Sequence, residues 1–174
     1  MPEPALAERP VEVLRPPVQA SALVCASPHS GCLYPQRFVA DAALDPASLR
    51  RTEDCFVDAL FGAAPELGVP LLRARFPRVF LDVNREPFEL DPAMFDGALP
   101  PFVNTGSPRV AAGLGTIARV VSANREIYRD RLAVDEALTR IRRFYRPYHR
   151  ALQELIETTR KKFGWCLLID CPPG

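Results

Sequence analysis

The sequence has no long apolar run and no sign of a leader segment. Its longest apolar stretches, such as W-C-L-L-I at residues 165–169, are far too short to cross a bilayer. The first ten residues, M-P-E-P-A-L-A-E-R-P, have neither the basic start nor the apolar stretch of a secretory signal. We therefore expect no membrane partner and a cytoplasmic location.

The sequence also lacks an excess of charge. Twenty-two Lys and Arg face 21 Asp and Glu, for a net charge of +1, so nothing attracts nucleic acid electrostatically. Five arginines gather in residues 140–150, but Glu136–Arg140 and Glu157–Lys161 are spaced for i,i+4 pairs. A solvated helix face is therefore favoured over a nucleic-acid patch. Nothing in the sequence specifies an oligomeric state.

No C-x-x-C pair occurs, and the five cysteines are an odd number in a chain without a signal. This usage predicts reduced thiols, several of them acting as small core residues. Proline is abundant instead: 19 in 174 residues is about twice the usual share of ~5%. The prolines cluster in residues 1–17 and 87–108 and at the end, which marks these regions as irregular.

The apolar pattern predicts an α/β protein. Residues 1–19 are expected to be an extended, Pro-rich lead-in without a core, and residues 20–174 to form the folded portion. Residues 87–115 lack periodicity and suggest a binding loop or lid. The expected strands are 21–27, 69–73, 78–84, 116–121 and 165–170, and the expected helices are 52–66, capped by Thr52, and 134–163, interrupted at Pro147. Strands separated by amphipathic helices predict a three-layer sandwich with a largely parallel, mixed sheet.

Three polar clusters follow predicted strands. They are P-H-S-G after the first strand, D-V-N-R at the end of the third, and D-C-P-P-G after the last. In parallel sheets, ligands bind beyond the carboxyl ends of the strands. The three clusters are therefore expected to meet in one site.

Six segments in register resemble the N-formylglutamate amidohydrolase family. They are S-P-H-S-G (27–31), T-E-D-C-F-V-D (52–58), F-P-R-V-F-L-D-V-N-R (76–85), G-L-G-T-I (113–117), Y-R-P-Y-H (145–149) and F-G-W-C-L-L-I-D-C (163–171). The resemblance implies a phosphorylase/hydrolase-like fold, shared with zinc carboxypeptidases and aspartoacylases. It also implies zinc-dependent hydrolysis of the amide bond of N-formyl-L-glutamate or a related N-acyl amino acid, a small-molecule partner.

The resemblance suggests two metal ligands. His29 follows a strand and precedes Gly31, so its imidazole can project into the crevice. Asp54 is the expected second ligand, because family members often carry Asp there. Glu53 competes for the role, since adjacent carboxylates at a helix start are not separated by sequence; both could also merely complement the helix dipole.

Asn84 and Arg85 suit recognition of a substrate carboxylate, because a planar guanidinium binds a carboxylate through two parallel hydrogen bonds. The alternative for Arg85 is an ordinary salt bridge with Asp82 or Glu86. Arg119, after G-L-G-T-I, is a weaker candidate for a second carboxylate contact. His149 lies beside a helical apolar stripe and is expected to be structural.

The sequence departs from the family at its last segment. There the family continues as D-x-H-S, whose His is the remaining zinc ligand, whereas Pro172 stands at that position here, and proline cannot bind a metal. The resemblance implies roughly another hundred residues, so the fold is expected to be incomplete at the C-terminus and the general base to lie beyond Gly174. The alternative function is a truncated or divergent, catalytically inactive relative that only binds a ligand or partner.

Overall fold

A computed structural model describes residues 3–121 and 124–171. Its central sheet has four strands in the order β1-β3-β2-β8. Strands β2 and β3 pair in parallel, β2 and β8 pair in parallel, and β1 runs antiparallel to β3. The bounds are β1 Val11–Leu14, β2 Leu23–Ser27, β3 Leu71–Ala74 and β8 Leu167–Asp170. The predicted α/β class with a mostly parallel, mixed sheet is thus confirmed.

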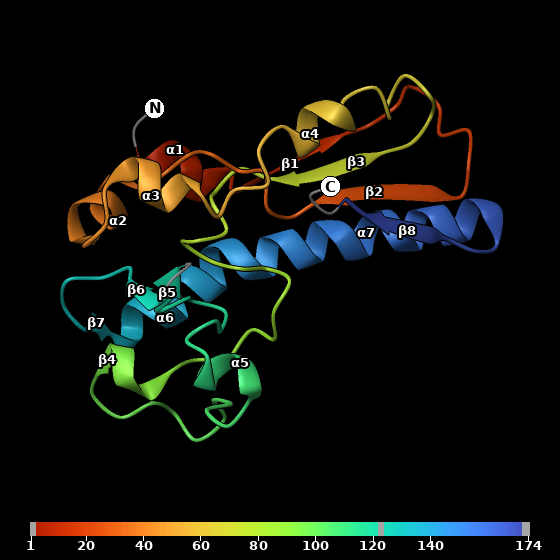
Figure 1. Ribbon diagram of the computed structural model, residues 1–174. Coiled ribbons are helices and arrows are strands. Elements are labelled where there is room, and N and C mark those ends of the chain that lie inside the picture. The colour runs from red at the N-terminus through yellow and green to blue at the C-terminus, as the bar shows by residue number, and fades with distance from the viewer. Residues whose placement is uncertain (1–2, 122–123, 172–174) are drawn as a thin grey trace.

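The sheet separates two apolar layers because side chains alternate along each strand. Val24 and Leu72 face the main core, into which the long helix α7 (Arg146–Phe163) packs. Cys25 and Leu71 face a smaller cluster with Val57 of the short helix α4 (Val57–Leu60). In Figure 1, α4 and α7 lie on opposite sides of the strands.

A second region, residues 86–145, packs at one end of α7 (Figure 1). It holds short elements between long loops: η1 Pro92–Met94, β4 Phe95–Asp96, α5 Pro108–Ala111, β5 Val120–Val121, β6 Arg125–Glu126, β7 Leu132–Ala133 and α6 Val134–Arg140. Strand β4 pairs with β7, and β5 with β6. Of the strand predicted at 116–121, only β5 forms.

The helix predicted at 134–163 forms as three consecutive parts. Helix α6 leads into a π-helical turn, η3 (Ile141–Tyr145), and α7 follows with Pro147 in its first turn. Proline lacks the N–H that a helix interior requires, so a change of helix type directly before it relieves the conflict. Gly164, with φ of 81°, ends α7 in the left-handed conformation that glycine adopts easily.

Three segments differ from their predictions. The lead-in expected at 1–19 is not coreless in its described part: residues 3–19 form α1 (Glu3–Glu8), with Leu6 buried, and β1, which completes one edge of the sheet. No strand forms at 78–84: the chain makes turns at 78–80 and 83–84, and Val79, Phe80 and Leu81 are buried in the core without strand pairing. Strand β8 forms where it was predicted, but Leu167 and Leu168 remain 50% and 39% exposed.

The helix predicted at 52–66 is also wrong. The backbone N–H of Asp54 donates to the carbonyl of His29 at 3.2 Å, and Phe56 takes a left-handed φ of 65°. This tertiary contact interrupts the helical path, so only α4 forms here. Two further helices precede it: α2 (Gln36–Asp41) and α3 (Pro46–Arg50), the latter capped by Asp45. Within the described residues, no helix has the length and apolar character needed to cross a membrane.

Candidate functional site

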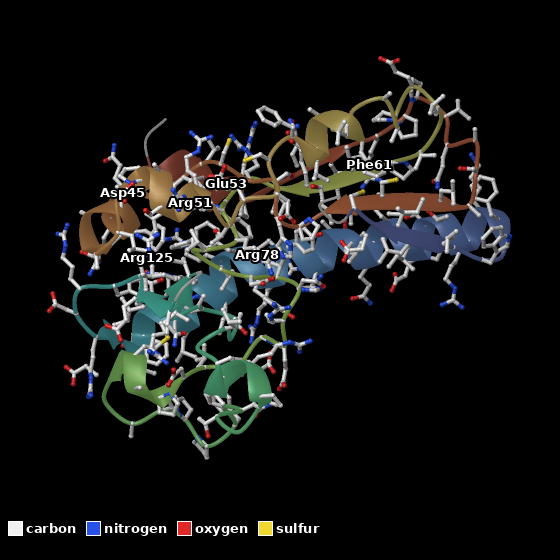
Figure 2. The ribbon with its side chains drawn as sticks, viewed as in Figure 1. Asp45, Arg51, Glu53, Phe61, Arg78 and Arg125 are labelled. Carbon is white, nitrogen blue, oxygen red and sulfur yellow. The ribbon has the colours of Figure 1, made fainter. Side chains whose placement is uncertain are left out.

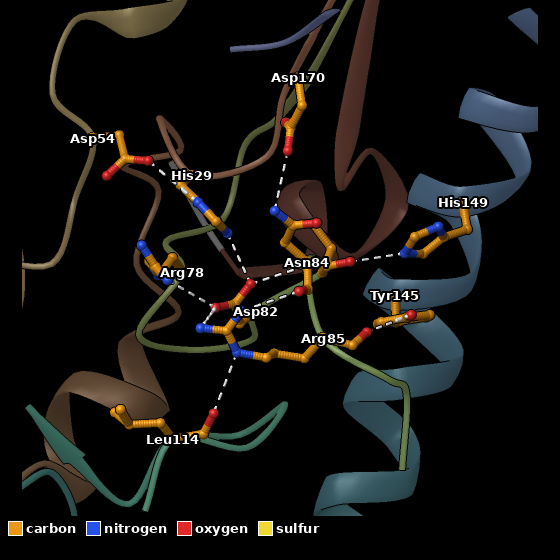
Figure 3. A network of polar contacts seen from close by, with 11 residues as sticks. His29, Asp54, Arg78, Asp82, Asn84, Arg85, Leu114, Tyr145, His149 and Asp170 are labelled. Carbon is orange, nitrogen blue, oxygen red and sulfur yellow. Dashed lines mark hydrogen bonds and ion pairs between the residues drawn. The ribbon is translucent and has the colours of Figure 1, made fainter. Parts of the chain in front are cut away.

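Residues of all three polar clusters meet beyond the carboxyl ends of the parallel strands, and the third cluster is described up to Cys171 (Figure 3). His29 follows β2, and its Nε2 lies 2.8 Å from Oδ1 of Asp82 in the segment after β3. Asn84 Nδ2 donates to Oδ2 of Asp170 at the end of β8, at 3.1 Å. One hydrogen-bonded group therefore links all three strands.

His29 lies between two carboxylates. Its Nδ1 is 3.2 Å from Oδ2 of Asp54, and its Nε2 contacts Asp82. All three side chains are at least nine-tenths buried. A neutral imidazole has one N–H and one lone pair, so it can donate to only one of two ionised carboxylates. The second contact therefore needs either one further proton or a cation shared by the ring nitrogen and the carboxylate.

The turn after β2 holds His29 in place because it is closely packed. A Cβ on Gly31 would lie 2.2 Å from the carbonyl oxygen of Phe76, so only glycine lets the two segments approach this closely. The hydroxyl groups of Ser27 and Ser30 are hydrogen-bonded at 2.6 Å across the same turn. These contacts explain why the S-P-H-S-G motif has glycine and serine at these positions.

Asp82 is the most heavily partnered acid of the site. Besides His29, it accepts from the backbone N–H of Asn84 at 2.9 Å and pairs with Arg78 at 3.2 Å and Arg85 at 3.6 Å. Burial alone would raise the pKa of Asp82, but the hydrogen bond and charge of His29, together with Arg78 and Arg85, outweigh it and lower that pKa to about 2. Asp82 is therefore ionised at neutral pH.

A cavity of about 320 Å³ opens beside this group, with Asp54, Asp82 and Arg85 in its wall. Arg51, Glu53 and Arg78 also line it and lie between the sheet and the second region (Figure 2). Its size suits a small ligand. Both interpretations of Arg85 have support. It lines the cavity, as recognition of a carboxylate requires, and it also forms an ion pair with Asp82.

Two other predicted site residues, Glu53 and Arg119, already have other partners. Glu53 accepts from the Tyr34 hydroxyl at 2.6 Å and pairs with Arg50 at 3.4 Å, so its carboxylate does not join Asp54 at His29. Burial and the bond to Glu53 raise the pKa of Tyr34. Arg119 pairs with Asp91 at 2.7 Å and with Glu126 at 3.4 Å, and it lines a different cavity.

Sequence reasoning missed the role of Asp82 as the second partner of His29. The only available signal was its place in D-V-N-R, two residues before Asn84. It also missed Tyr145, whose hydroxyl donates to the carbonyl of Arg85 at 2.7 Å. His149 was expected to be structural, and its Nε2 lies 2.9 Å from the carbonyl oxygen of Val83.

A larger cavity, of about 460 Å³, lies around Arg140. The buried guanidinium of Arg140 bonds Glu136 at 2.8 Å and the Tyr128 hydroxyl at 2.7 Å, and it lies 4.3 Å from the ring centre of Phe80. These partners satisfy the charge internally. Among the described residues that line this cavity, the one acid is Glu136, and it is already bound to Arg140, so the chemistry points to the smaller cavity.

The metal donors that the described residues bring together are limited. Within residues 3–121 and 124–171, no three His, Cys, Asp or Glu side chains converge as a metal site. His29 Nδ1 and Asp54 form a pair of donors, whereas Asp82 approaches the opposite ring nitrogen. The family's remaining zinc ligand was expected at the position of Pro172, and the general base was expected beyond Gly174. Both positions lie outside the described residues.

Fold and site together define a mixed α/β protein with a buried imidazole–carboxylate group at the carboxyl ends of parallel strands. The sequence model of the N-formylglutamate amidohydrolase family matches residues 21–172. The chain therefore belongs to this family.

Three relatives are similar to the chain. A curated N-formylglutamate deformylase from Pseudomonas putida is 25% identical over 152 residues, which cover 85% of this chain and 50% of that protein. The crystal structure of an N-formylglutamate amidohydrolase from Ralstonia eutropha is 41% identical, with a TM-score of 0.85, over 92% of this chain and 56% of that one. The chain thus spans about half the length of these relatives.

The second solved structure supports the fold alone. A gene product of Agrobacterium tumefaciens superposes with a TM-score of 0.69 at 18% identity, over 95% of this chain and 57% of that one.

Proposed function

We propose that the chain contributes a zinc-dependent amidohydrolase site that acts on N-formyl-L-glutamate or a related N-acyl amino acid. The observation that carries the proposal is the contact of 3.2 Å between His29 Nδ1 and Asp54 Oδ2, buried at the carboxyl ends of parallel strands. Membership of the family supports the reaction class.

The donor pair fits a zinc ion. Two bonds of ~2 Å at a tetrahedral angle place the two donor atoms roughly 3.3 Å apart, close to the observed 3.2 Å. Asp82 would accept from Nε2–H and so orient the ring, as carboxylates commonly do behind a metal-bound histidine. When bound, zinc lowers the pKa of its water and polarises an amide carbonyl. His29 and Asp54 are the residues that would hold it.

Asn84 and Arg85 would recognise the acid end of the substrate. The guanidinium of Arg85 lies in the cavity wall, and its Nε donates to the carbonyl of Leu114 at 3.3 Å, which fixes its plane. A carboxylate entering the cavity would compete with Asp82 for this cation. Arg119 is left out of the proposal because its two acid partners already neutralise it.

A second candidate is a relative that binds an N-acyl amino acid without hydrolysing it. It is favoured by the number of donors, since the described residues bring together two, whereas a stable zinc site usually has three or more protein ligands. The two candidates share the ligand and differ in metal binding and turnover.

Zinc content separates them. Purified protein dialysed against micromolar zinc is expected to retain close to one zinc per chain, and the His29→Ala and Asp54→Asn variants to lose it. Glu53→Gln is the matched control, because that neighbouring carboxylate is bound to Tyr34 and Arg50. Equal zinc retention in all four proteins would sink the assignment of His29 and Asp54.

Formate release from N-formyl-L-glutamate with added zinc then distinguishes hydrolysis from binding. Zinc retention with measurable turnover supports the hydrolase, whereas ligand binding without turnover supports the second candidate. Replacing Arg85 by Lys is expected to weaken ligand affinity about tenfold, because lysine loses the two parallel hydrogen bonds. An unchanged affinity would remove Arg85 from the site.

A further inference from the structure

Two aromatic side chains hold the backbone on both sides of Asn84 (Figure 3). The Tyr145 hydroxyl donates to the carbonyl of Arg85 at 2.7 Å, and His149 Nε2 lies 2.9 Å from the carbonyl of Val83. Because a carbonyl oxygen only accepts, the proton of His149 is on Nε2. The carbonyls before and after Asn84 are therefore both anchored to one helical segment.

The helical segment is built to present this pair. Tyr145 is the last residue of the π-helical turn η3, and His149 follows in the first turns of α7. Their ring centres lie 4.3 Å apart, so each ring limits the rotation of the other. π-Helical turns often occur at functional positions, since the extra residue re-aims a side chain. Here the turn ends on the residue that bonds Arg85.

The backbone that Tyr145 and His149 anchor is hydrogen-bonded to the centre of the site. The backbone N–H of Asn84 donates to Oδ1 of Asp82 at 2.9 Å, and the same oxygen contacts His29 Nε2 at 2.8 Å. On the other side, Arg85 carries the guanidinium that reaches the cavity. A shift of this backbone would therefore move both the acid that orients His29 and the cation that faces a ligand.

We propose that Tyr145 and His149 are positioning residues, which fix the Asn84–Arg85 backbone in the orientation needed to bind a carboxylate ligand. The identity of that ligand rests on the proposed function; the anchoring does not. Tyr148 is the natural comparison. It is a tyrosine of the same helix, it is buried, and within the described residues its hydroxyl makes no hydrogen bond to residues 82–85.

The variants separate anchoring from packing. Tyr145→Phe removes only the hydroxyl, His149→Leu removes the donor, and His149→Gln keeps an N–H that can reach the same carbonyl. Tyr148→Phe is the matched control. Amide hydrogen exchange of Asn84, measured by NMR on the ligand-free protein, is the first readout. We expect about fivefold faster exchange in Tyr145→Phe and His149→Leu, and wild-type exchange in His149→Gln and Tyr148→Phe.

Affinity for N-formyl-L-glutamate, measured by calorimetry, is the second readout. We expect Tyr145→Phe and His149→Leu to bind it about five- to tenfold more weakly, with no change for the same molecule carrying amides in place of both carboxylates. Unchanged Asn84 exchange in these two variants, or equal exchange in His149→Leu and His149→Gln, would overturn the proposal. So would unchanged affinity for the acid.

A wild-type protein that binds no N-formyl-L-glutamate would count against the proposed function. The exchange readout would still decide the anchoring, so the two failures are distinguishable.

Discussion

Two parts of the central sheet differ in which side chains they bury. The first is the site at the carboxyl ends of β2 and β3, and the second is the edge strand β8. At the first, an imidazole and two carboxylates are buried, and each has a partner of opposite or complementary character. In the second, two leucines of an apolar strand remain 50% and 39% exposed. In these two places, polar side chains are buried where partners contact them, and apolar side chains remain exposed where no described element covers them.

Removing the central acid should cause the largest loss. Asp82→Ala leaves His29, Arg78 and the N–H of Asn84 without their shared acceptor. Breaking a buried ion pair from one side costs several kcal/mol, so we expect the free energy of unfolding to fall by about 4 kcal/mol. Urea unfolding measures it. Asp96→Ala, at an exposed aspartate, is the control, and equal losses in both variants would show that the group at Asp82 contributes nothing special.

Two leucines on the strands that flank β2 in the sheet sharpen the contrast. Leu72 of β3 is fully buried, and truncating it to Ala should cost about 3 kcal/mol through lost contacts and a cavity. Leu168→Ala in β8 should cost less than about 1 kcal/mol, because much of that side chain is already in water. Similar losses in both variants, measured by urea unfolding, would mean that β8 is covered in solution.

A smaller loss is expected at the turn that carries His29. Gly31→Ala adds a Cβ that would lie 2.2 Å from the Phe76 carbonyl, and the backbone must shift to admit it. Crowding of this kind costs about 2 kcal/mol. Gly106→Ala is the matched control, since nothing lies within 4 Å of the added Cβ there. A Gly31→Ala protein as stable as the control would show that the turn yields freely.

The smallest effect is expected from Glu53→Gln. Its carboxylate accepts from Tyr34 and pairs with an exposed Arg50, and an uncharged amide retains an oxygen for the first contact. A change in unfolding free energy of about 1 kcal/mol is expected, because the Glu53 carboxylate is buried but Arg50 is exposed and glutamine still accepts from Tyr34, and zinc retention should be unaffected. A large loss of zinc would instead restore Glu53 as the ligand.

Where local pattern and tertiary contact agree, the sequence predicted the structure. The strands at 23–27, 71–74 and 167–170 and the helical stretch from 134 to 163 all follow from apolar spacing. The choice of Asp54 as the partner of His29 came from the family resemblance, because Asp54 lies between α3 and α4 and does not follow a strand. Asp54 itself shows the limit. Its bond to the His29 carbonyl interrupts the helix that its own neighbourhood favours, and no local pattern encodes that contact.

Residues 1–19 show a second limit. Strand β1 is four residues long and only partly buried, and its place in the sheet comes from pairing with β3, some sixty positions later. The residues of a short strand do not indicate which strand it pairs with. The same applies to Asp82, whose importance comes from a ring nitrogen on a different segment.

The register that joins Leu23 to Leu167 has a consequence for how the protein is made. Leu167 leaves the ribosome 144 residues after Leu23 (167 − 23). At about 5–20 residues per second, β2 waits on the order of ten seconds for this neighbour. During that time one edge of β2 stays open to other nascent chains. Contacts so distant along the chain also slow folding, so the pairing of β2 with β8, and with it the contact of Asn84 with Asp170, should form late.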